Sequence, residues 1–164
     1  NNTIFVITAD HTSKHFKPRY KTTTGTYMVP IIIYAPGDST ICGYDEEQIA
    51  EQIDIMPTIM TYLGYDKPYV AFGRDVLSTN GSTPLALHWV PEFGGYEYIE
   101  GDYALHFDGQ NVTHAYRYKT DISLSENILA EIEPEMLDAM TTRMKAFIQQ
   151  YMQRINTNNL IVRE

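Results

Sequence analysis

The chain has 164 residues, of which 43% are hydrophobic and 20% are charged, a composition typical of a globular protein and not of a disordered one. Asp and Glu outnumber Lys and Arg by 21 to 12, and the resulting net charge of -9 argues against binding to nucleic acid. No stretch approaches the roughly 20 apolar residues of a membrane span, and the single cysteine, Cys42, excludes an internal disulfide framework. We therefore expect the chain itself to be soluble.

The N-terminal region contains two apolar runs, from Thr3 to Thr8 and from Val29 to Ala35, neither of which alternates polar with apolar residues. Such runs are typical of strands buried on both faces inside a parallel sheet. Two strands do not make a doubly wound sheet. We therefore expect the chain to be the C-terminal portion of a larger α/β domain, with open sheet edges through which the isolated chain can self-associate.

A helix is predicted to begin near Asp54 and to end at Gly64, which suits a left-handed stop. Asp54 is expected to cap this helix by accepting hydrogen bonds from the backbone N–H groups of the first turn. Apolar residues recur at helical spacing in two stripes along this helix, so we expect it to be covered on two sides.

The pattern changes after Ser78 to short strands separated by glycine-containing turns. The predicted strands cover residues 85–90, 96–99, 103–107 and 111–118. Asp108-Gly109 predicts a tight hairpin between the last two strands. The register we expect turns His106 away from His114, so that these histidines do not form a metal pair.

The chain closes with a predicted helix from about Pro134 to about Ile155, whose broad, methionine-rich face should lie against the antiparallel sheet. We divide the chain into residues 1–77, the C-terminal portion of the α/β domain, and residues 78–164, an antiparallel subdomain with its C-terminal helix.

The chemically informative residues follow the first strand. Asp10 and His11 lie where that strand ends, which is where ligands bind in open α/β sheets. A carboxylate beside an imidazole suits zinc or manganese better than calcium, although a solvated pair at a strand end is the plain alternative. His15 lies one helical turn beyond His11 and is a candidate substrate contact, with a mobile surface loop as its alternative.

Nucleophilic catalysis within the chain finds little support, because there is no Gly-x-Ser-x-Gly elbow and Cys42 has no activating motif. The 13 Tyr residues favour a second reading, in which the antiparallel region is a non-catalytic module that binds a substrate or partner. Its candidate contacts are Trp89, Tyr96, Tyr98 and Tyr116.

Three motifs taken together resemble the closing segment of the catalytic domain in the sulfatase and alkaline phosphatase superfamily. They are Val6–Thr12 (VITADHT), Tyr27–Gly37 (YMVPIIIYAPG) and Gln52–Ile59 (QIDIMPTI), in that order. The chain looks most similar to lipoteichoic acid synthase-like sulfatases and phosphoglycerol transferases. Ala71–Leu77 and Tyr103–Gly109 fit the segment that leads into their C-terminal subdomain and one of its strand pairs.

This resemblance implies an α/β fold, the C-terminal portion of an alkaline phosphatase-like doubly wound sheet, followed by the small antiparallel sheet and helix. It implies that Asp10 and His11 bind the catalytic divalent metal, manganese or zinc, with calcium and magnesium as alternatives. The nucleophile and the remaining ligands lie in N-terminal segments of such enzymes, so no catalytic nucleophile is expected in these 164 residues.

The resemblance also implies what the parent protein does. It would be a metal-dependent sulfatase or phosphoglycerol transferase that acts on sulfate or phosphate esters, lipid- or glycan-linked, through a covalent intermediate. We expect that parent to be anchored in the cytoplasmic membrane with its catalytic domain outside, and the isolated chain to be inactive.

Overall fold

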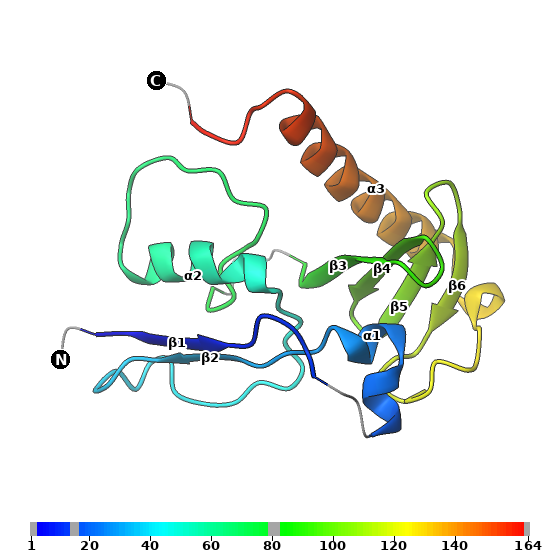
Figure 1. The fold of residues 1–164 in the computed structure, drawn as a ribbon, viewed down its shortest axis with the longest axis horizontal. Coiled ribbons are helices and arrows are strands. Elements are labelled where there is room, and N and C mark those ends of the chain that lie inside the picture. The colour runs from blue at the N-terminus through cyan, green and yellow to red at the C-terminus, as the bar shows by residue number, and fades with distance from the viewer. Residues whose placement is uncertain (1–2, 14–16, 79–82, 163–164) are drawn as a thin grey trace.

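The computed structural model describes residues 3–13, 17–78 and 83–162, which form two sheets accompanied by helices (Figure 1). This mixture of helices and sheets with a long C-terminal helix confirms the α/β class expected for a portion of an alkaline phosphatase-like fold. Within the described residues, no helix combines the length and the hydropathy needed to cross a membrane.

The first sheet contains two strands, β1 (Phe5–Thr8) and β2 (Ile31–Tyr34), which pair antiparallel with Phe5 opposite Tyr34. The parallel arrangement expected from their uniform apolar composition is therefore not the one observed between them. A parallel pair needs a crossover of a dozen or more residues, usually a helix that packs on the sheet. In the described part of the connection, residues 9–13 and 17–30, the helical elements are the one-turn helix α1 (Thr23–Thr26) and a short 3-10 turn.

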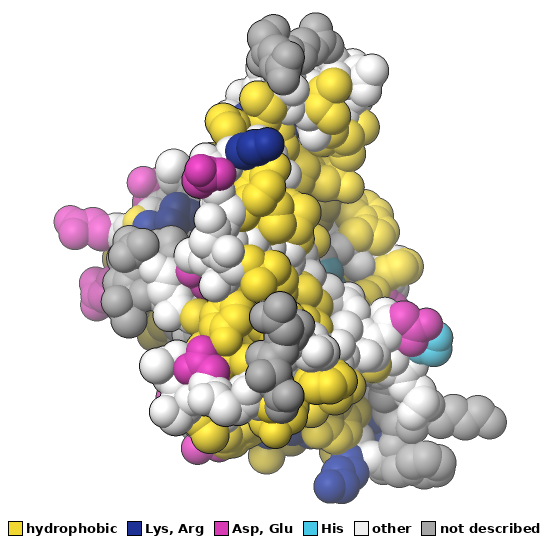
Figure 2. All heavy atoms as spheres, turned by 90° about the vertical axis from the view of Figure 1, so that its left-hand side faces the viewer, with side chains coloured by type: hydrophobic (Ala, Val, Ile, Leu, Met, Phe, Trp, Pro, Cys, Tyr) yellow, Lys and Arg dark blue, Asp and Glu magenta, His cyan; other side chains and the backbone are white. Residues whose placement is uncertain are grey.

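One face of this small sheet is bare. Residues opposite one another in an antiparallel pair share a face, so Phe5, Ile7, Ile32 and Tyr34 lie on the same side, and each is 48–57% exposed. Burial on both faces is therefore not observed within the described chain. Figure 2 views the side of the molecule that holds β1, β2 and α2, and hydrophobic side chains run down it in a broad band. Such a surface favours contact with further protein.

The helix α2 (Ile55–Tyr62) follows a 3-10 turn at Gln52–Asp54. Only Pro57 and Thr58 are buried on it, whereas Met56 is 47% exposed, so its two apolar stripes are not both covered. Asp54 does not cap α2 with its side chain, contrary to the sequence-based expectation. It accepts instead from the backbone of residues outside the helix, because the preceding 3-10 turn directs its carboxylate backwards.

The second sheet has the strand order β3-β4-β5-β6 and is antiparallel throughout. Its strands are β3 (Leu85–Val90), β4 (Gly95–Glu100), β5 (Tyr103–Phe107) and β6 (Val112–Tyr116). The expected strand positions are thus close to those observed.

The register of the last hairpin differs from the expected one. His106 lies opposite His114, with ring centroids 6.0 Å apart, so the two histidines share a face. The prediction that His106 faces away was wrong for two reasons. The hairpin closes at Phe107 and Val112, and an irregularity between His106 and Phe107 shifts the pairing by one residue.

The helix α3 (Pro134–Asn156) packs against this sheet through its first half. The core holds aromatic and aliphatic side chains from the strands together with two methionines of the helix: Tyr98, Leu105, Phe107, Ala115, Ile128, Ile132, Met140 and Met144. The second half of the helix continues beyond this core. There Phe72 packs edge-on against Tyr151 with ring centroids 5.0 Å apart, so this part of the apolar stripe also contacts the chain leading into β3.

Candidate metal centre

Asp10 and His11 lie in a bend directly after β1, where the chain has left strand geometry. Their side chains are 87% and 79% exposed. The backbone N–H of His11 donates to Asp10 Oδ1 at 2.9 Å, and this contact turns the second carboxylate oxygen, Oδ2, towards the imidazole. Asp10 Oδ2 and His11 Nε2 are 3.6 Å apart. The bend therefore brings two side chains together that a regular strand would point to opposite faces.

The hydrogen bonding of His11 selects its tautomer. Nδ1 lies 2.7 Å from the backbone carbonyl oxygen of Thr12. A carbonyl oxygen can only accept, so Nδ1 carries the hydrogen and the lone pair of the neutral ring is on Nε2. The contact with Thr12, followed by the negative charge of Asp10, raises the pKa of His11 above its ordinary value. The nitrogen that can bind a metal is therefore the one that faces Asp10.

This donor pair fits a divalent metal ion. Two donors bound at about 2.1 Å in tetrahedral geometry lie about 3.4 Å apart, close to the 3.6 Å between Asp10 Oδ2 and His11 Nε2. A metal-binding histidine usually donates its other ring N–H to a carbonyl or carboxylate, as His11 does to Thr12. Over the described residues, no group of three or more His, Cys, Asp or Glu side chains could hold an ion. His15, the third candidate, lies outside those residues.

The loop that carries the pair is attached at two points. The Thr12 hydroxyl donates to the carbonyl of Thr26 at 2.6 Å, which ties the loop to the end of α1. On the other side, the Gln52 side-chain amide donates to the carbonyl of Ala9 at 2.5 Å. The predicted pair is thus held between α1 and the chain that leads into α2.

A buried ionic cluster that sequence reasoning missed lies in the second sheet. The Glu97 carboxylate is completely buried. His106 Nε2 lies 2.9 Å from one of its oxygens, and His88 Nε2 lies 3.3 Å from the other. Burial raises the pKa of Glu97, but the hydrogen bonds from His106 and Thr23 and the nearby imidazole of His88 outweigh it and lower the pKa to about 2. A lone acidic residue within the apolar strand Tyr96–Ile99 is the signal that could have revealed this cluster.

The side chains proposed as contacts of a binding module fall into two groups. Tyr98 and Tyr116 are buried in the core, so they cannot contact a partner. Trp89, by contrast, is 49% exposed, and together with Tyr96 it lines a cavity of about 390 Å³ next to α3. Of the four candidate contacts, Trp89 and Tyr96 therefore line a cavity, whereas Tyr98 and Tyr116 are buried.

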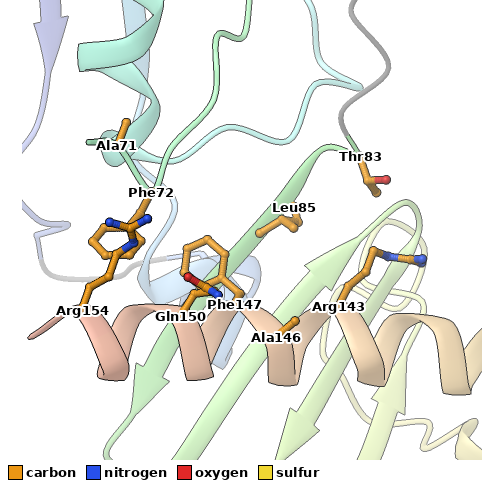
Figure 3. A pocket seen from close by; sticks show the side chains of 9 residues that line it. All are labelled: Ala71, Phe72, Thr83, Leu85, Arg143, Ala146, Phe147, Gln150 and Arg154. Carbon is orange, nitrogen blue, oxygen red and sulfur yellow. The ribbon is translucent and has the colours of Figure 1, made fainter. Parts of the chain in front are cut away.

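A second hollow of about 490 Å³ lies between α3, the start of β3 and the segment at Phe72 (Figure 3). Its two arginines are already engaged. Arg143 forms a two-pronged ion pair with Glu100, with Nε 2.9 Å from Oε2, and Arg154 donates to the carbonyl of Asn159. This hollow therefore offers no unpaired guanidinium to an anion.

The part of the chain that carries the Asp10–His11 pair matches a known protein family. The sulfatase family model matches residues 1–65, a segment that includes β1, α1, β2 and α2. This match, together with the relative described next, supports a relationship between this part of the chain and the sulfatase and alkaline phosphatase superfamily.

Among individual proteins, the chain is similar to the multifunctional alkaline phosphatase superfamily protein PehA of Trinickia caryophylli, with 30% identity over 81 residues. The aligned part is 47% of this chain and 16% of that protein, so the chain spans only a small share of its relative.

Proposed function

We propose that this chain is the C-terminal part of a metal-dependent enzyme that hydrolyses or transfers sulfate or phosphate esters, with Asp10 and His11 as two of its metal ligands. The observation that carries the proposal is the geometry of His11. Its Nδ1–H is held by the Thr12 carbonyl, which leaves Nε2 free to bind, 3.6 Å from Asp10 Oδ2. This pair lies in the segment that matches the sulfatase family.

Manganese or zinc suits the carboxylate and imidazole donors best. Such an ion, when bound, polarises the ester and favours attack at the sulfur or phosphorus atom. The chain's own contribution is to hold the two donors at the end of β1. We propose that the nucleophile and the remaining ligands belong to further chain outside these 164 residues, and that His15 contacts the substrate.

The exposed apolar face of the small sheet supports the proposal that further chain completes this domain. Phe5, Ile7, Ile32 and Tyr34 form one continuous apolar surface, and exposed surfaces of this kind are usually covered by protein. In the proposed arrangement, residues 1–77 complete an α/β catalytic domain and residues 78–164 form a subdomain packed beside it. The proposal extends to a parent anchored at the membrane, with this domain outside the cytoplasm and a lipid- or glycan-linked ester as its substrate.

The proposal is tested by metal content and turnover in the complete protein. Asp10→Asn and His11→Gln each remove one donor at nearly constant size. Each is expected to lower bound Mn²⁺ or Zn²⁺ and to reduce turnover of a generic phosphate or sulfate ester at least a hundredfold, because catalytic metal chemistry carries several kcal/mol of the barrier. Asp66→Asn, on an exposed loop, is the matched control. Unchanged metal content and turnover in the Asp10 and His11 variants would show the assignment to be wrong.

A second candidate function is a non-catalytic binding module, favoured by the exposed Trp89 beside the 390 Å³ cavity. Aromatic side chains at such a position are suited to stacking against a ring or an apolar partner group. Trp89→Ala should then abolish partner or glycan binding while ester turnover is unchanged. If turnover requires Asp10 and His11 and does not change in the Trp89 variant, the catalytic proposal stands and the binding-module hypothesis is not needed.

A further inference from the structure

The backbone that carries the candidate metal ligands reaches the second sheet through α1. Thr12, one residue after His11, is bonded to the end of this helix at Thr26. At the start of the helix, the Thr23 hydroxyl donates to Glu97 Oε2 at 2.5 Å. Just after it, the Tyr27 hydroxyl donates to the carbonyl of Trp89 at 3.1 Å. A one-turn helix is not stable by itself, so these contacts determine where it lies.

Glu97 is the central group of this attachment. Its carboxylate can only accept hydrogen bonds, and it faces Thr23 on α1 and the imidazoles of His106 and His88 on the neighbouring strands. The ring of His88 in turn packs against Tyr27, with centroids 4.1 Å apart. A fully buried carboxylate is costly unless it is well paired. The contacts of Glu97 therefore favour one position of α1 over others.

We propose that Glu97 is a positioning residue for the candidate metal site, acting through Thr23 and α1 on the backbone that carries Asp10 and His11. The inference rests on the proposed role of that pair as metal ligands. Asp10 and His11 are largely exposed, so their own packing does little to hold them. Metal sites require their donors within a few tenths of an ångström of the productive geometry. The sheet supplies this restraint through Glu97, Thr23 and the Thr12–Thr26 hydrogen bond.

Two substitutions test the link from opposite ends. Glu97→Gln keeps the size of the side chain and removes the charge that pairs with the histidines. Thr23→Val keeps the shape of the threonine and removes the hydroxyl that reaches Glu97. Thr23→Ser retains that hydroxyl and serves as the rescue variant. Ile128→Val shortens a side chain buried in the core of the second sheet and is the control for lost stability alone.

The measurement is the Kd for Mn²⁺ alone in the complete protein, followed by electron paramagnetic resonance, together with backbone hydrogen exchange over residues 22–27. Glu97→Gln and Thr23→Val are expected to weaken Mn²⁺ binding roughly tenfold, the lower end of the range for groups that orient metal ligands. Both should also speed exchange in α1. Thr23→Ser and Ile128→Val should leave the Kd close to that of the wild type.

The outcomes separate this inference from the proposed function. If Glu97→Gln and Thr23→Val lower thermal stability but leave the Kd unchanged, while Asp10→Asn abolishes binding, Glu97 supports the fold only and the inference is overturned. If Asp10→Asn also leaves the Kd unchanged, the metal assignment itself fails and the inference fails with it. Should Glu97→Gln not fold, the comparison of Thr23→Val with Thr23→Ser decides the question.

Discussion

The carboxylate of Asp54 accepts a hydrogen bond of 2.7 Å from the backbone N–H of Arg74, a residue 20 positions further along the chain. Its other oxygen accepts from the backbone N–H of Glu51 at 2.8 Å, within a reciprocal capping box. Asp54 is only 4% exposed. This side chain therefore joins the start of α2 to the segment that leads into the second sheet.

Asp54→Ala should lower the free energy of unfolding by about 3 kcal/mol, because it leaves two buried backbone donors without a charged acceptor. Urea denaturation of the chain measures the change. Asp66→Ala, at an exposed loop position, should change stability by less than about 0.5 kcal/mol. Equal effects of the two substitutions would mean that the bonds of Asp54 contribute nothing.

Gly73, in this linking segment, lies close to the backbone of the turn before α2. A Cβ atom there would lie 2.2 Å from the backbone carbonyl oxygen of Ile53. Gly73→Ala should therefore separate the two segments and cost about 1–3 kcal/mol of stability. Gly94→Asn is the comparison, because Gly94 has a positive φ of 64° with open space around it, and asparagine tolerates that conformation. Thermal unfolding should distinguish the two variants by several degrees.

Glu51 should make the chain less stable as the pH rises towards neutrality. Burial raises the pKa of its carboxyl to about 7, against 4.5 for the ordinary group, and the charge of Asp54 adds to the effect of burial. The folded chain therefore retains this proton between pH 4.5 and 7 while the unfolded chain releases it. The contribution of this proton to the free energy of unfolding is complete below pH 4.5 and is lost as the pH rises through 7. The total loss is about 3 kcal/mol.

The matched variant for this titration is Glu51→Gln. Urea denaturation at several values between pH 4.5 and 7 should show a decline in the wild type that is much smaller in the variant. Parallel curves for the two proteins would assign the pH dependence to other groups.

The bare sheet face should make the isolated chain self-associate. Ile7 and Ile32 lie opposite one another on this face and are 56% and 49% exposed. Ile7→Lys or Ile32→Lys should shift the chain towards a monomer in analytical ultracentrifugation, because a charge opposes burial of the surface. Ile161→Lys, an exposed position beyond α3, is the control. A wild-type chain that remains monomeric at high concentration would contradict the expected association.

Much of the local structure follows from the sequence. Strand alternation and glycine-containing turns predicted β3 at residues 85–90, where the structure has it, and helical spacing predicted a helix from 134 to 155 against the observed Pro134–Asn156. The Asp10–His11 motif could be read directly, since it follows an apolar strand, and the motifs up to Ile59 indicated the superfamily. These features are local, so a short window of residues carries them.

Only the tertiary structure decided which residues meet. An apolar run has no polar face to set its orientation, so the sequence did not determine the antiparallel pairing of β1 with β2. An irregularity of a single residue placed His106 opposite His114. The hydrogen bond between Thr23 and Glu97 joins positions 74 residues apart. It forms because folding removes both side chains from water, so that each becomes the other's hydrogen-bond partner. The sequence by itself determined the candidate ligands, and the fold decided what holds them in place.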